Sequence, residues 1–235
     1  MDGVLGSLLQ KMGCKPNSHI WMTELNRTSP DLIMDVHKSY IKARADIITT
    51  NTFRTNPAAL EVIEISNAAP YVKEAVKLAK VAVSDDSIYI AGLNAPAEDC
   101  YQKKRNLSYK KLEMNYKIHI DLLIDNNVNF ILNETQSHLD EITIICKHCL
   151  TNKLPYVLSF YFDNKLNILS GESLESVIKL VVEHDPLAIG INFIAPDILE
   201  KILQEINLDH NWGFYLNCGS LNYFDKDIVS GVDSK

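Results

Sequence analysis

The chain alternates between short apolar runs and longer amphipathic stretches. The apolar runs are rich in β-branched, aliphatic and aromatic residues and lack strict alternation, which is typical of parallel strands buried on both faces. We therefore predict six strands, at Ala45–Thr52, Ile88–Pro96, Asn129–Thr135, Pro155–Phe162, Pro186–Phe193 and Trp212–Cys218.

The amphipathic stretches between these runs predict helices. The first follows "TSP", with Ser29 as N-cap and Pro30 at the first helical position. The second is long, and we expect a break near Pro70 because proline lacks the N–H that a helix interior needs. The predicted helices are Asp31–Ala43, Ala58–Val83, Ser108–Asn126, Leu139–Asn152, Ser173–His184 and Pro196–Ile206.

This strand–helix alternation predicts an α/β fold with a parallel sheet. The spacing of the strands favours a (β/α)8 TIM barrel, and the absence of a linker or a composition break predicts one domain over residues 1–235. Because barrel sites gather at the C-terminal ends of the strands, asparagines near those ends are of interest. Each is by itself a common turn former, yet five on one rim would favour a polar binding surface. They are Asn51, Asn94, Asn133, Asn192 and Asn217.

Composition narrows the classes of function. The formal net charge of −7 argues against a nucleic-acid surface, and the run Lys103–Arg105 favours a solvated loop over a local anion site. No run approaches the length of a membrane span, and the N-terminus does not resemble a signal peptide. The odd number of cysteines, five, fits a reducing, cytoplasmic location.

Several motifs, taken in order, resemble those of homocysteine S-methyltransferases. "MDGVLGSLLQKMG" is similar to the family's Asp-Gly-x-x-Gly-Thr-x-Leu, and "DVHKSY" to its Val-His-x-x-Tyr helix. "ADIITTNTF", "AGLNAP", "NFILNETQSHLDEI", "SFYFDNKLNILSGESLESVI", "AIGINF" and "FYLNCGS" follow in the family's order. Each motif is weak alone, whereas the ordered set covers nearly the whole chain.

The resemblance implies a TIM barrel that transfers a methyl group to the thiol of homocysteine, giving methionine. The donor would be a small molecule of the S-methylmethionine, betaine or methyl-folate type. Glu134 would hold the substrate ammonium by a charge-assisted hydrogen bond, although a surface carboxylate at a strand end is the alternative. By position, the implied substrate-binding residues are Asp2, Gly3, Val4, Asn51, Thr52, Glu134 and Asn192.

The resemblance also implies a zinc cofactor, which this sequence does not support. The family holds zinc with three cysteines, one after Gly-x-Asn and two in Gly-Gly-Cys-Cys. A free thiol has a pKa near ~8.5, and zinc would deprotonate it and fix its position. Here Phe193 follows Asn192, and no Gly-Gly-Cys-Cys occurs. We therefore expect no zinc, no metal site and no assignable catalytic residue.

Other cysteines and histidines offer weak substitutes. Cys146 and Cys149 form "CKHC" inside a predicted helix, which favours core packing over a zinc or redox site. Cys100 and Cys218 lie after strands and could approach the rim, but their spacing predicts no ligand set. His37 is expected to be a hydrogen-bonded structural residue, and His119 belongs to no evident constellation.

Relative to the family, the chain is short at both ends. Only Met1 precedes the Asp-Gly motif, and the chain stops at Lys235. We expect the strands equivalent to 1 and 8 to be largely missing, which opens one seam and leaves two strand edges unpaired. A covering element from residues 221–235, a homo-oligomeric partner or poor solubility would follow.

Two hypotheses of function remain open from the sequence. The chain is a homocysteine S-methyltransferase, or it is a degenerate, non-catalytic member that binds homocysteine, a similar amino acid or a protein partner. An unrelated α/β barrel would need further rim acids, and beyond Glu134 and Asp163 we find few.

Overall fold

The computed structural model describes residues 1–84, 87–207 and 209–216, and within them six parallel strands form one curled sheet in chain order. All six predicted strands are confirmed, as is the class of incomplete (β/α) barrel. The strands are β1 (Ile47–Thr49), β2 (Tyr89–Asn94), β3 (Phe130–Gln136), β4 (Tyr156–Phe160), β5 (Ala188–Ile194) and β6 (Trp212–Leu216).

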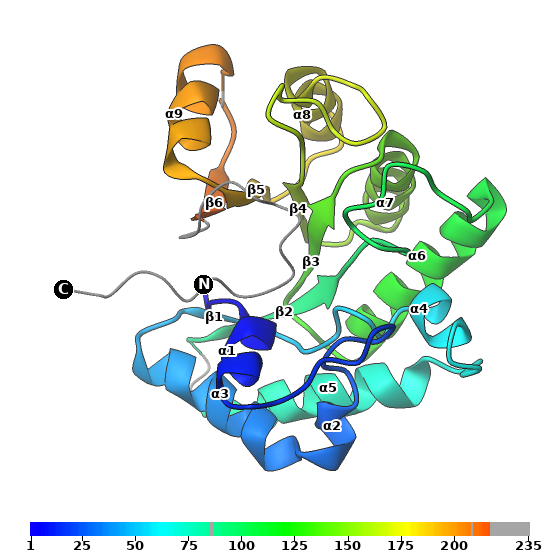
Figure 1. Cartoon of the computed structure of the whole chain (residues 1–235), viewed down its shortest axis with the longest axis vertical. Coiled ribbons are helices and arrows are strands. Elements are labelled where there is room, and N and C mark those ends of the chain that lie inside the picture. The colour runs from blue at the N-terminus through cyan, green and yellow to red at the C-terminus, as the bar shows by residue number, and fades with distance from the viewer. Residues whose placement is uncertain (85–86, 208, 217–235) are drawn as a thin grey trace.

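Helices follow one another around the outer side of the sheet, from α3 beside β1 to α9 beside β6 (Figure 1). The predicted helices appear as α3 (Pro30–Lys42), α4 (Pro57–Glu61), α5 (Ala69–Ala82), α6 (Tyr109–Asp125), α7 (Leu139–Asn152), α8 (Leu174–Val182) and α9 (Pro196–Glu205). The short helices α1 (Leu5–Lys11) and α2 (Leu25–Thr28) were not predicted.

Two helix boundaries test the reasoning from sequence. Pro70 lies in the first turn of α5 and α4 ends at Glu61, so the long region is two helices separated by a loop. Ser29 is the N-cap residue of α3, but its side chain makes no capping hydrogen bond. The side chain of Ser173 does cap α8, accepting from the backbone N–H of Ser176.

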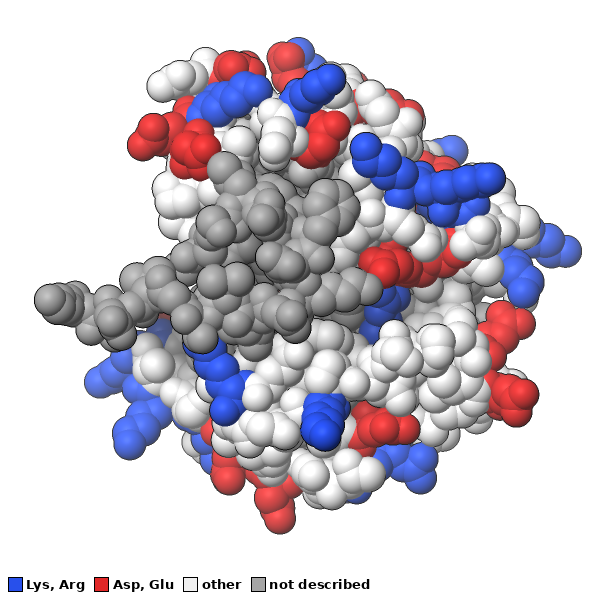
Figure 2. All heavy atoms as spheres, in the orientation of Figure 1, with Lys and Arg blue, Asp and Glu red and all other residues white. Residues whose placement is uncertain are grey.

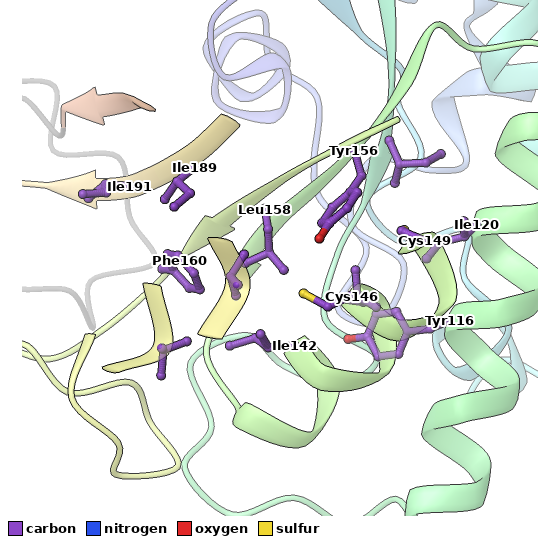
Figure 3. Packing of buried hydrophobic residues seen from close by; sticks show 14 of the residues in the cluster. Tyr116, Ile120, Ile142, Cys146, Cys149, Tyr156, Leu158, Phe160, Ile189 and Ile191 are labelled. Carbon is purple, nitrogen blue, oxygen red and sulfur yellow. The ribbon is translucent and has the colours of Figure 1, made fainter. Parts of the chain in front are cut away.

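The main core lies between the outer face of the sheet and the helices (Figure 3). Cys146 and Cys149 of α7 are fully buried there, beside Tyr116 of α6 and Tyr156 of β4. Burial raises the pKa of the two thiols to about 11 and about 12, so both are protonated at neutral pH. The expected packing role of "CKHC" is therefore confirmed.

Asp2 partly covers the seam between β1 and β6. Among the described residues these two strands do not pair, and each is an edge of the sheet. Asp2, however, covers the edge of β1: its N–H donates to Ile47 O at 2.8 Å, and its Oδ2 accepts from the backbone N–H of Thr49 at 2.8 Å. From β6, the Tyr215 hydroxyl donates to Asp2 O at 3.4 Å.

The expectation of a fully unpaired edge at β1 was therefore wrong, because one residue supplies both a donor and an acceptor to it. The proposed covering segment, 221–235, lies outside the described residues, and the homo-oligomer stays a prediction.

Acidic and basic side chains are interspersed on the face seen in Figure 2. Over the described part of the chain, no helix has the length and apolar character needed to cross a bilayer.

Candidate functional site at the strand ends

Bulges interrupt β3 and β5 near their C-terminal ends. The register with the next strand shifts between Asn133 and Gln136 on β3, and between Ile191 and Ile194 on β5. Inside each bulge one residue adopts a left-handed backbone, Thr135 with φ 63° and Phe193 with φ 53°. This conformation is strained for a β-branched or bulky residue, and such strain concentrates at functional sites.

Each strained residue directly follows a predicted site residue, Glu134 on β3 and Asn192 on β5. A bulge re-aims side chains relative to the regular strand. The two bulges bring the carboxyl and the amide together, and the Asn192 amide favours the charged form of Glu134. Burial is nevertheless the stronger influence, and it raises the pKa of Glu134 to about 7.

Asn192 is a buried amide that lies close enough to Glu134 to favour its charged form, but both amide atoms fall short of ordinary hydrogen-bond geometry. Only 1% of the residue is exposed, and neither Nδ2 nor Oδ1 forms a bond of ordinary geometry with a described residue, even though the amide adjoins Glu134. An unsatisfied buried polar group costs about 1–3 kcal/mol, so most such groups in proteins have a partner. The amide is thus available to a bound molecule.

Asp2 adds a second carboxyl to this region, and this one is almost fully buried. Its Oδ2 accepts from Thr49 Oγ1 at 3.0 Å as well as from the Thr49 N–H, whereas Oδ1 is buried without a partner. Burial raises the pKa of Asp2 to about 6, against the opposing effect of the Thr49 hydrogen bonds. The charge of Asp2 also contributes to the raised pKa of Glu134.

Two tyrosines complete the cluster. Burial raises the pKa of Tyr215, and the carboxyls of Glu134 and Asp2 add to that shift. Tyr40 approaches the chain so closely at Gly3 that an added Cβ would lie 2.9 Å from the Tyr40 hydroxyl. We call Asp2, Tyr40, Glu134, Asn192 and Tyr215 the rim cluster. It holds two carboxyls, an unpaired amide and two phenols.

A cavity of about 690 Å³ inside the half-barrel reaches three members of the rim cluster, whereas Glu134 and Asn192 are not among its lining residues. Its polar lining includes Asp2, Tyr40 and Tyr215, and its volume is in the range of small-molecule sites. The apolar lining is formed by Phe130, Leu132, Val157, Trp212 and Phe214, among others.

The other expected site residues have different surroundings. Val4 is exposed at the N-cap of α1. Asn51 Nδ2 donates to Met22 O at 3.0 Å and to Asn26 Oδ1 at 2.9 Å, and Thr52 Oγ1 donates to Leu93 O at 2.6 Å. The Asn51 and Thr52 side chains therefore bond to neighbouring segments of the protein at the wall of the site.

Comparison with known proteins identifies the relatives of this chain. The sequence profile of the family described as "Homocysteine S-methyltransferase" matches residues 1–232. The chain belongs to the homocysteine S-methyltransferase family. It is 23% identical to Homocysteine S-methyltransferase 2 of Arabidopsis thaliana, over 88% of this chain and 71% of the relative. It is 22% identical to Homocysteine S-methyltransferase of Escherichia coli K12 and 23% to Selenocysteine Se-methyltransferase of Brassica oleracea var. italica, covering 73% and 68% of them.

Solved structures of the family agree with the fold. The metallated form of the homocysteine methyltransferase MmuM from Escherichia coli superposes with a TM-score of 0.82 at 21% identity, over 94% of this chain and 84% of that one. The apo form of the same enzyme gives a TM-score of 0.71. At this identity the likeness supports the half-barrel alone.

The residues at the rim do not fit the zinc that the family resemblance implies. Phe193 occupies the expected position of the first cysteine, and a phenyl ring has no lone pair to donate. Cys100 is buried, and burial raises its thiol pKa to about 12. Within residues 1–84, 87–207 and 209–216, no three His, Cys, Asp or Glu side chains could together hold a metal ion. Cys218 and Asn217 lie outside these ranges.

The sequence did not indicate the hydrogen bonds that hold His119. This residue is fully buried on α6 and bonds to Thr55 Oγ1 at 2.9 Å and to Asn94 Oδ1 at 2.8 Å. The available signal was position: His119 shares the apolar face of α6 with Tyr116 and Leu123, where a polar ring needs partners. His37 is buried too, but contrary to expectation neither ring nitrogen has a partner among the described residues.

Proposed function

We propose that this chain binds homocysteine, or a similar small amino acid, at the rim cluster. The observation that carries the proposal is the pair of bulges that brings the Glu134 carboxyl beside the unpaired Asn192 amide. The family assignment supplies the substrate class.

The chemistry of the rim cluster suits an amino-acid ammonium. A cation beside Glu134 would restore the charged carboxylate that burial disfavours, giving a charge-assisted hydrogen bond. Asn192 Oδ1 would accept a second ammonium proton. The backbone at Asp2, Gly3 and Val4 would meet the carboxylate end of the ligand, while Asn51 and Thr52 support the wall.

We further propose that the chain binds without zinc-dependent methyl transfer. Transfer to a thiol is aided by a positioned thiolate, and Phe193 cannot supply the metal ligand that the family would place there. The second candidate is the family reaction, methyl transfer from an S-methylmethionine, betaine or methyl-folate donor to give methionine. The family match over residues 1–232 favours that candidate.

Calorimetry with homocysteine tests the binding proposal, using Glu134→Gln as the variant. The substitution keeps the size of the side chain and removes its charge, so binding should be lost. Glu113→Gln, at an exposed position of α6, is the matched control and should bind as the parent does.

A second assay separates the two candidates. Purified protein is supplied with homocysteine, each donor in turn and zinc, and methionine is measured. Binding without methionine supports the non-catalytic proposal. Methionine formation together with stoichiometric zinc would overturn it.

A further inference from the structure

We propose that His119 is a positioning residue for the rim cluster: through a one-directional chain of buried hydrogen bonds, it fixes the strand end that carries Glu134. The inference rests on the proposed function only for its ligand, because the chain of bonds is a property of the protein itself. We call Thr55, His119, Asn94, Asn133 and Val157 the relay. These residues join the loop after β1, α6, β2, β3 and β4.

The direction of the relay is set at its far end. Val157 O can only accept, so Asn133 Nδ2 donates to it at 3.2 Å and leaves Asn133 Oδ1 as an acceptor. Asn94 Nδ2 donates to that oxygen at 2.7 Å. Asn94 Oδ1 must then accept as well, and its neighbour at 2.8 Å is His119 Nδ1. The Nδ1 atom therefore carries a proton.

The other side of the imidazole follows from burial. His119 is fully buried, and burial lowers its pKa to about 3, so the ring is neutral. With the proton on Nδ1, Nε2 is an acceptor and receives the Thr55 hydroxyl at 2.9 Å. The Thr55 hydroxyl has one proton and two acceptors within reach, His119 Nε2 at 2.9 Å and Thr52 O at 3.2 Å. We assign the proton to the nearer Nε2, because Thr52 O also accepts the backbone N–H of Thr55 at 3.2 Å. Every relay member thus has a partner in one consistent arrangement.

The relay holds Asn133, the residue directly before Glu134. Both polar atoms of the Asn133 side chain are held, one from β2 and one by β4, so the residue before Glu134 is fixed on two sides. The bulge that follows contains the strained Thr135. A strained backbone persists only where its surroundings enforce it. We infer that losing the His119–Asn94 bond relaxes this bulge and moves the Glu134 carboxyl.

Two substitutions at His119 separate its proposed role in positioning the end of β3 from a role in filling the core. In His119→Asn the amide nitrogen can occupy the place of Nδ1 and still donate to Asn94 Oδ1. In His119→Gln the amide reaches the place of Nε2, so the Thr55 contact can survive while the Asn94 bond is lost. Both variants remove part of a buried ring. His148→Asn, outside the relay, is the control for losing a hydrogen-bonded histidine.

The readouts are the titration midpoint of the Glu134 carboxyl by carbon-13 NMR and the Kd for homocysteine by calorimetry. His119→Gln should move the midpoint from about 7 toward the ordinary value near ~4.3 and weaken binding about tenfold, the effect of one charge-assisted hydrogen bond. His119→Asn and His148→Asn should stay within about twofold of the parent Kd. Equal effects of the two His119 variants would overturn the proposal.

If both His119 variants fail to fold, nitrogen-15 NMR of the unaltered protein decides. A protonated Nδ1 with a bare Nε2 supports the relay, whereas the reverse tautomer contradicts it. Failure of the proposed function can be told apart from failure of the relay. In that case the parent binds no homocysteine, while the titration midpoint of Glu134 still moves in His119→Gln alone.

Discussion

Replacing Asp2 by asparagine should change how the stability of the protein depends on pH. Asp2 is 2% exposed and spans the seam, holding β1 through Thr49 and Ile47 while accepting from Tyr215. Asparagine has the same shape, and its Oδ1 can still accept from the Thr49 N–H. It cannot ionise, so the substitution isolates the cost of the buried charge.

The size of this cost follows from the raised pKa of Asp2. A change from 3.8 to about 6 corresponds to about 3 kcal/mol, since one pH unit is worth about 1.4 kcal/mol. Because the folded protein holds this proton more tightly than the unfolded chain, the contribution favours folding below about pH 4. It is lost as pH rises through about 6.

Urea denaturation at pH values from 4 to 8 measures the effect. Asp2→Asn should match the parent near pH 4 and exceed its free energy of unfolding by about 3 kcal/mol at pH 8. The raised pKa of Glu141 is common to both proteins and cancels in the difference. The pKa of Glu134 falls when the Asp2 charge is removed, which adds to the advantage of Asp2→Asn at pH 8. Asp35→Asn, at an exposed position of α3, should run parallel to the parent. A destabilised Asp2→Asn protein at pH 8 would refute the reasoning.

Two further pairs of variants test the fold through denaturation midpoints. Gly190→Ala should lower the free energy of unfolding by about 1–3 kcal/mol, because the added Cβ would lie 2.4 Å from Ser159 Oγ. Gly213→Ala, on the paired strand, should be near neutral because nothing lies within 4 Å of its added Cβ. Equal costs of the two variants would contradict the packing. Ser173→Ala should cost about 1 kcal/mol through loss of a helix cap, and Ser29→Ala should cost little because its side chain caps nothing; a larger loss at Ser29 would argue against this N-terminus.

The central strands were predictable because they are largely buried on both faces, whereas β6 is mostly exposed. Runs such as Pro155–Phe162 are apolar except for Ser159, which is the pattern of a strand covered on both sides. The break before Pro70 was predictable for a similar reason, since the missing N–H of proline is a local property. The chain order of the strands follows from their alternation with helices.

The bulges were not predictable, and they create the candidate site. Nothing in "NETQ" or "INFI" indicates that Thr135 and Phe193 adopt positive φ, because that strain is imposed by neighbouring strands. The sequence did identify Glu134 and Asn192, both by their places near strand ends and by the family motifs that surround them. Their mutual approach is a tertiary result.

Long-range hydrogen bonds explain the remaining differences. Asn94 and Asn133 were expected on a binding rim, but they bond to one another, and Asn94 also bonds to His119. Asp2 was expected only at the ligand, yet it also covers the edge of β1. These partners are 25 to 47 positions apart in the chain, beyond the reach of any local pattern.

The most direct test of the account is the affinity for homocysteine as a function of pH, in the parent protein and in Glu134→Gln. With a carboxyl pKa of about 7, Glu134 is largely ionised at pH 8 and largely neutral at pH 6, so the parent affinity should fall about tenfold between them. Glu134→Gln should bind far more weakly at both values. Absence of binding at pH 8, or an unchanged affinity in the variant, would contradict the assignment of the ammonium to Glu134.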